Sequence, residues 1–588
     1  MIKCGRFFYD MSKKLVTLIF GAIIIYLTLL SLWSTCVEAP EYLIDAEGNE
    51  IRNQEFVYFV SDNPVRMILI VAVLIIVFWG MYLVLQRTKL SLNVFTLVKI
   101  VCAGFFIVSL IFILSTRYEL RSDPAKVMNA AHEFINGDFH QFEPGEYINK
   151  NPQQIGFMLY MCGLILIFGE AAGLIMQIIN AAAMAVAYYY IAKIVYLFWN
   201  QTKAVIAVVV SMAVSIPMIF YTTFVYGNIV GFVFVVMAIY QELMLFQDEK
   251  IYRIFLTAIF VLLSIFLKKN FLIVMIAMLI IGIIEFFRGG KILLMLKFAG
   301  MILAFWFIGN QILTLAMSSA IGYDLPKGLP ATTYIVMGLE YGGASPGAYN
   351  GRSAEIYTDN HYDYDAANRA AKAKIADIMR GYMDDWRSGL HFFGMKQAGQ
   401  WNEPSFQCFK ILWSRQSAVG ESNFIRNLTK GRISYLLLEI FNIAHTFILV
   451  GVCAYIFMSR EDRKLAELIF AVIFIGGFLF HTFWEAKSEY TLLYFLLLIP
   501  YMVKGYGCLF RKLSIILEEV RNDQLSVSGL IKRMLIVICA MAVIMTAGMC
   551  VGRMKTFQDV FAPRSSQDKL EQYERQIEEI KNGEAYFN

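Results

Sequence analysis

Apolar runs of about 20 residues, separated by short polar segments, recur along most of this chain. The clearest run is 67–86, MILIVAVLIIVFWGMYLVLQ, which contains no charged residue. A helix of that length crosses the hydrocarbon core of a bilayer, which is about 30 Å thick. The pattern therefore predicts an all-α polytopic membrane protein with about 13 transmembrane helices. We expect these helices at 15–33, 67–86, 94–115, 172–198, 203–222, 227–246, 254–268, 271–287, 293–315, 434–457, 466–484, 489–505 and 530–550.

One apolar run is too short for this scheme. The segment 155–169, IGFMLYMCGLILIFG, would invert every later loop if it counted as a full span. We therefore expect a helix that lies in the outer interface of the membrane or dips partway into it. A tilted short span is the alternative.

Composition and cysteine usage agree with a membrane protein. The chain has 588 residues, of which 58% are hydrophobic and 16% charged, below the roughly 25% charged of a soluble domain. The net charge of +5 comes mostly from loops on one side and gives no reason to expect nucleic acid. Nine cysteines are scattered without a CxxC pair, which favours core positions over a disulfide framework. The segment 15–33 lacks a small-residue cleavage site, so we expect an uncleaved first helix.

The distribution of Lys and Arg predicts the orientation of the chain. Short cytoplasmic loops retain basic residues, and Lys3, Arg6, Lys13 and Lys14 place the N-terminus inside. Residues 35–66 carry seven acids against two arginines and fall outside. We expect a multi-pass protein of the cell (plasma) membrane with an extracytoplasmic active site.

This orientation divides the chain into six parts. We expect N-terminal transmembrane helices at 1–115, a first catalytic extracytoplasmic loop with interfacial helices at 116–171, central transmembrane helices at 172–315, a large mixed extracytoplasmic loop domain at 316–433, C-terminal transmembrane helices at 434–550 and an extracytoplasmic amphipathic tail at 551–588.

The outer segment 121–139, RSDPAKVMNAAHEFINGDF, is rich in acids and directly follows an apolar helix. A carboxylate such as Asp123 at the membrane edge is suited to act as a general base on an acceptor hydroxyl. The alternative is a helix cap, because the sequence Ser-Asp-Pro is typical of a first helical turn. Asp138 is a second candidate acid, although its setting in Asn-Gly-Asp is more typical of a turn.

Several segments together resemble the GT-C glycosyltransferases, polytopic enzymes that use lipid-phosphate-linked sugars. The resemblance rests on this acidic segment, on NPQQIGF at 151–157, on SIPMIFYTTFVYGNIVGF at 215–232, on FLKKNFLI at 266–273 and on FHTFWEAKSEYTLLYFLLLIP at 480–500. It implies a GT-C fold, a donor such as an undecaprenyl-phospho-sugar, and an extracytoplasmic glycan or other outer acceptor. The aspartate of the first large outer loop is the catalytic base in that family, which implies this role for Asp123, and a single displacement would invert the anomeric centre.

A leaving phosphate develops negative charge and calls for cations at the outer interface. Lys268 and Lys269 interrupt an apolar run at an outer junction, and Lys487 and Arg415 are further candidates. Neighbours on a helix diverge by about 100°, so we expect one of the two lysines to face the phosphate, with Lys269 favoured. Binding to lipid headgroups is the alternative for both. Further residues of the donor or acceptor site are expected to be His132, Tyr147, Gln153, Gln154, Tyr226, Asn228, His481 and Glu485.

The chain departs from the metal-using members of that family. The loop where those members carry an acidic pair is TTFVYGN here, with Asn228 in place of an acid. Hard divalent cations need several oxygen ligands, usually with carboxylates among them. We therefore expect metal-independent chemistry with no cofactor, as in the protein mannosyltransferase and aminoarabinose transferase branches.

Two other classes of protein fit the same pattern of helices. A flippase or transporter of polyprenyl-linked glycans would also be polytopic, with ionisable residues inside its helices. Here the charges gather outside the predicted spans, which favours an enzyme. A non-catalytic scaffold of an envelope synthesis complex is the third possibility.

Overall fold

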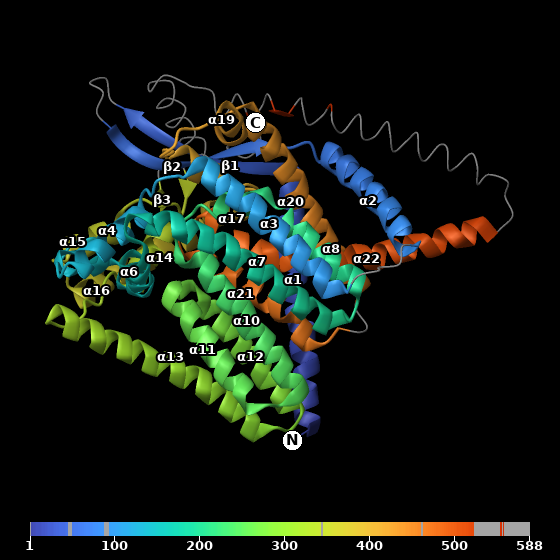
Figure 1. Ribbon diagram of the computed structural model, residues 1–588, viewed down its shortest axis with the longest axis horizontal. Coiled ribbons are helices and arrows are strands. Elements are labelled where there is room, and N and C mark those ends of the chain that lie inside the picture. The colour runs from blue at the N-terminus through green and yellow to red at the C-terminus, as the bar shows by residue number, and fades with distance from the viewer. Residues whose placement is uncertain are drawn as a thin grey trace.

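The computed structural model of the chain is mostly helical (Figure 1). It describes residues 2–44, 50–87, 93–342, 345–459 and 463–522, together with the single residues 548, 553, 554 and 557.

Within these ranges, ten helices are long and apolar enough to cross a membrane. This confirms an all-α polytopic membrane protein. The helices are α1 (Ile2–Trp33), α2 (Pro64–Arg87), α3 (Val94–Thr116), α7 (Ala172–Trp199, at the end of the longer stretch Pro152–Trp199), α10 (Gly227–Asp248), α12 (Leu272–Arg288), α13 (Ile292–Ile321), α20 (Arg432–Met458), α21 (Ile469–Phe483) and α22 (Leu492–Asn522). Helices α12 and α21 reach this length together with the 3-10 turns that precede them, Lys269–Phe271 and Leu465–Leu468.

Three of the 13 expected spans are not among these ten helices. The run 203–222 is divided into α8 (Thr202–Ala213) and α9 (Ile216–Tyr221), because Pro217 cannot continue a helix from the preceding turn. The run 254–268 forms α11 (Ile251–Leu267), whose 17 residues measure only about 26 Å. The span 530–550 and the tail 551–588 lie outside the described residues, apart from the four single positions.

A β-hairpin that the sequence analysis did not predict follows the first helix. Strands β1 (Ser34–Ile44) and β2 (Glu50–Ser61) pair antiparallel, with Ser34 opposite Ser61. The run FVYFV, residues 56–60, consists of aromatic and β-branched residues, which favour a strand. A second, two-residue pair joins β3 (Tyr341–Gly342) and β4 (Ser345–Pro346).

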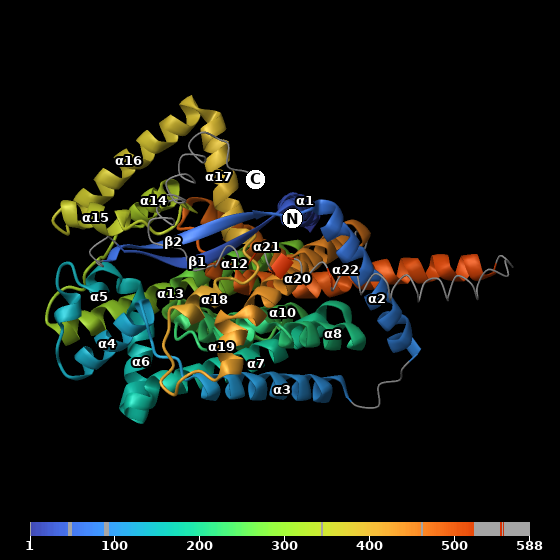
Figure 2. The ribbon, with the colours of Figure 1, turned by 90° about the horizontal axis from the view of Figure 1, so that it is seen from above.

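The two large regions 116–171 and 316–433 lie together at one end of the bundle, which we call the loop side (Figures 1 and 2). The backbone of Tyr118 pairs with that of Ser417, and the amide of Leu329 donates to the carbonyl of Lys150 at 3.0 Å. The two regions therefore face the same side of the membrane. Their helices are α4 (Asp123–Ile135), α5 (Tyr147–Lys150), α6 (Ile155–Phe168), α14 (Ala331–Leu339), α15 (Arg352–Asp359), α16 (Tyr364–Asp384), α17 (Trp386–Trp401), α18 (Cys408–Trp413) and α19 (Asn423–Lys430).

Helix α6 is the short apolar run that was expected to be interfacial. A Cβ at Gly156, near its start, would lie 2.1 Å from the carbonyl oxygen of Phe266, at the loop-side end of α11. Gly169 breaks the chain after α6 with φ of 56°, and α7 then begins beside Leu120, also on the loop side. Both ends of α6 lie on the same side, so this helix runs along the bundle's edge and does not cross it.

Candidate functional site

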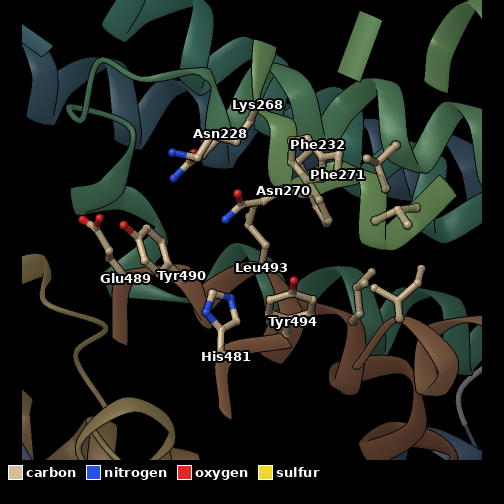
Figure 3. Close-up of a pocket in the computed structure, with 14 residues that line it drawn as sticks. Asn228, Phe232, Lys268, Asn270, Phe271, His481, Glu489, Tyr490, Leu493 and Tyr494 are labelled. Atoms are coloured by element: carbon tan, nitrogen blue, oxygen red, sulfur yellow. The ribbon is translucent and has the colours of Figure 1, made fainter. Parts of the chain in front are cut away.

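A pocket opens among helix ends of the loop side, between the α10–α12 group and the α21–α22 pair (Figure 3). Its empty volume, including the open mouth, is about 540 Å³. Lys268, Asn228, Glu489 and Tyr490 lie toward one end of it (Figure 3). The lining continues with apolar residues from four helices. The full lining is Asn228, Phe232, Val235, Lys268, Asn270, Phe271, Val274, Ile473, His481, Glu489, Tyr490, Leu493, Tyr494 and Leu497.

A glycine brings two walls of the pocket together. Gly227 begins α10 against the last turn of α11, where an added Cβ would lie only 1.9 Å from the carbonyl oxygen of Leu267. Only a residue without a side chain permits this approach. The next residues of the two segments, Asn228 and Lys268, both line the pocket.

Lys268 provides the positive charge of the pocket. It ends α11 in an extended conformation (φ −154°, ψ 112°), and its Nζ lies 4.0 Å from the ring centroid of Tyr226 and 5.8 Å from that of Tyr490. Burial lowers the pKa of Lys268 to about 8, while the charges of Glu489, Asp123 and Glu485 favour its protonated form. An ammonium that has lost much of its water gains more from a bound anion than a hydrated one does.

The segment between α21 and α22 supplies the opposite side of the mouth. Tyr490 donates to Glu485 at 2.9 Å, and Lys487 pairs with the same carboxylate at 3.4 Å. The His481 ring stacks on Tyr490 with centroids 5.4 Å apart. Burial raises the pKa of the Tyr490 hydroxyl well above its ordinary value, so that it acts as a neutral donor.

Helix α17 holds that segment from outside the bundle. Lys396 donates from Nζ to the carbonyls of Gly338 and Trp484, at 2.5 and 2.7 Å. Gln397 donates to the hydroxyl of Thr482 at 2.8 Å, and Gln400 to the carbonyl of Lys487 at 3.5 Å. Just after the helix, buried Glu403 accepts from Ser488 at 2.9 Å. These contacts fix the backbone that carries Glu485, Lys487 and Glu489.

Asp123 lies at the start of α4, outside the lining of the pocket, and its charge acts on Tyr226 and Lys268. It occupies the first turn of that helix, is exposed, and accepts no hydrogen bond from any residue that the structure describes. Burial raises the pKa of Tyr226, and the charges of Asp123 and Glu489 raise it further, so the three groups lie close enough to interact. Ser122 holds the cap position with φ of 57° and makes no capping hydrogen bond from its side chain.

Several expected site residues surround Tyr226 and the mouth of the pocket. Gln154 donates to the Tyr226 hydroxyl, which also interacts with that of Tyr147. Gln153 donates to Tyr334 at 3.4 Å, and the Tyr334 ring stacks on Trp484 with centroids 5.0 Å apart.

Of the expected site residues, Lys268, Asn228 and His481 line the pocket, and the other eleven, including Asp123, do not. Lys269 is exposed, whereas Lys268, the lysine that was not favoured, lines the pocket. Buried Arg415 donates to the carbonyl of Thr223 at 2.7 Å, and burial lowers its pKa to about 10; it supports a neighbouring loop. Asp138 accepts from the amide of His140 at 3.0 Å, as a turn residue does. His132 lies near the end of α4 and is half-buried.

Sequence reasoning did not select Glu489, Tyr490 or Asn270 as site residues. The available signal was spacing, because Glu485 and Glu489 flank one lysine in a segment that joins two spans. Which of the two acids enters the pocket depends on the turn Ser488–Tyr490, which a helical period does not describe.

No protein-family model matches this chain, and no curated protein matches it either. In the part of the chain that the structure describes, no three His, Cys, Asp or Glu side chains are placed to hold a metal ion. The expectation of metal-independent chemistry stays a prediction. The function must accordingly be argued from the geometry of the pocket alone.

Proposed function

We propose that this protein is a membrane glycosyltransferase of the GT-C type, which moves a sugar from a polyprenyl-phosphate carrier to a glycan or other acceptor on the loop side. The observation that carries the proposal is the pocket, with a lysine and polar groups at its mouth and an apolar lining that continues between spanning helices. A lipid-linked phosphate has the same division into a charged head and a long apolar tail.

The depth of the pocket relative to the hydrocarbon core supports a lipid donor. Helices α11 and α12 have 17 residues each, about 26 Å, which is less than the roughly 30 Å hydrocarbon core. The turn between them, which carries Lys268, therefore lies at the edge of the core, where a lipid phosphate resides. An aqueous substrate would not need a cation at that depth.

The reaction that we propose gives each charged group one role. Asp123 takes the proton of an acceptor hydroxyl, whose oxygen forms a bond to the anomeric carbon. The bond from that carbon to the phosphate oxygen breaks, and its electron pair stays on the phosphate. Lys268 offsets the developing charge, with Lys487 as the second cation. One displacement of this kind inverts the anomeric centre.

Lipid analysis of the purified protein tests the donor class. We expect a polyprenyl phosphate or its sugar ester to copurify with the wild type and to be depleted in Lys268→Met. Reconstituted protein supplied with a polyprenyl-phosphate-linked sugar should then release polyprenyl phosphate when an acceptor is present. Movement of the intact lipid-linked sugar across the bilayer, without cleavage, would instead identify a flippase.

A further inference from the structure

An exposed apolar surface lies at the corner between α16 and α17. Met383, Trp386 and Leu390 are 69%, 60% and 64% exposed. Trp386 and Leu390 are four residues apart and share one face of α17, and Met383 lies in the last turn of α16 just before them. The guanidinium of Arg387 lies 5.6 Å from the Trp386 ring. We call Met383, Trp386 and Leu390 the apolar corner.

The depth of this corner follows from the contacts of α17. Lys396 contacts Trp484, Gln397 contacts Thr482 and Gln400 contacts Lys487. The Phe393 ring lies 6.1 Å from that of Phe483. All these contacts involve the last turn of α21 and the few residues after it. Helix α17 therefore lies across the loop-side end of α21, at the depth where that membrane-spanning helix ends.

From its contacts with α21, helix α17 runs sideways to the apolar corner. Trp386 precedes Lys396 by ten residues, or about 15 Å of helix. Figure 1 shows the long apolar helices α1, α3 and α13 lengthwise, whereas Figure 2, turned by 90°, shows α16 and α17 standing away from the bundle. The corner consequently lies beside the bundle, level with the end of a span, where lipid headgroups meet acyl chains.

We propose that the apolar corner inserts into this headgroup boundary and anchors residues 316–433, which we call the loop-side domain, to the lipid bilayer. Tryptophan prefers the boundary because its ring is apolar while its N–H is polar. Arg387 beside it keeps its charged end in water while its stem covers apolar surface. This inference does not depend on the reaction proposed above.

Tryptophan quenching in proteoliposomes tests the contact. Phosphatidylcholine brominated near the glycerol end of its acyl chains quenches indoles at the boundary, whereas iodide quenches indoles in water. We expect Trp386→Phe to remove a component of the emission that bromolipid quenches and iodide does not. Trp413→Phe is the matched control, because that indole donates to the carbonyl of Thr429 within the loop-side domain, and its loss should leave the bromolipid-quenched fraction unchanged.

The proposal would be overturned if the emission of Trp386 behaved like that of an indole in water. Quenching of that component by iodide alone places the corner in water. Protection from iodide by the soluble oligosaccharide cellohexaose would instead make the corner a glycan surface. Elution of both variants as the wild-type species in size-exclusion chromatography establishes that the fold is retained.

Discussion

Replacing Lys268 by Met keeps the aliphatic stem and removes the charge from the pocket. A hydrogen bond to a charged group contributes about 1.5–3 kcal/mol, so affinity for undecaprenyl phosphate should fall about 10- to 150-fold. Titration of the detergent-solubilised protein with that lipid, followed by native mass spectrometry, measures the change. Lys269→Met is the matched control: its side chain is exposed, and an exposed charge contributes about 0–1 kcal/mol, or less than about fivefold.

The pH dependence of the same titration gives an independent check. Burial lowers the pKa of Lys268 to about 8 in the empty pocket, and a bound phosphate would raise it again. Affinity should therefore stay level between about pH 7 and pH 8, where the phosphate has already lost its second proton (pKa about 6), and fall above about pH 8 by up to about tenfold per pH unit. Lys268→Met should remove this fall. Equal and small effects of both lysine substitutions, with an unchanged pH profile, would refute the phosphate role of Lys268.

Three further predictions concern the base, the α17 contact and the helix junction. Asp123→Asn should reduce sugar transfer by about 10²–10⁴-fold with donor binding retained, whereas Asp138→Asn should change it little; the reverse result would exchange their roles. Burial lowers the pKa of Lys396 to about 7 against about 10.4 unfolded, so the folded state binds fewer protons and stability should rise with pH between these values. The melting temperature of Lys396→Met should not show this rise with pH. If the rise persisted in the variant, it would come from the titration of another group. Gly227→Ala should cost about 1–3 kcal/mol by separating α10 from the Leu267 carbonyl, and an unchanged melting temperature would contradict the close approach.

The membrane helices could be predicted from the sequence because a bilayer imposes a simple rule. A span must be long and apolar, and its backbone must bond within itself. The run 67–86 satisfies this rule without any tertiary information, and it corresponds to α2. The β-hairpin could not be predicted in the same way. Its aromatic and β-branched residues lie in a segment whose acids indicated only the side of the membrane, and strand propensity depends strongly on the residues that a strand packs against.

The choice between Lys268 and Lys269 shows where periodicity stops being informative. The prediction treated the two lysines as neighbours on a helix, separated by about 100°. In the structure α11 ends at Leu267, and Lys268 is extended before a short 3-10 turn. The pocket lysine is thus selected by where a helix ends. Helix ends are the least predictable feature of an apolar run.

The site segment after α21 depends on residues that lie far away in the sequence. Lys396, Gln397 and Gln400 share one face of α17, but their partners lie more than 80 residues later. No pattern within α17 indicates what that face contacts. The contact matters because Glu485 and Lys487 lie on a segment with few regular backbone bonds of its own. Helix α17 supplies the missing restraint, and its far end is the apolar corner. A membrane contact at Trp386 would therefore limit the motion of the helix that positions the mouth of the pocket.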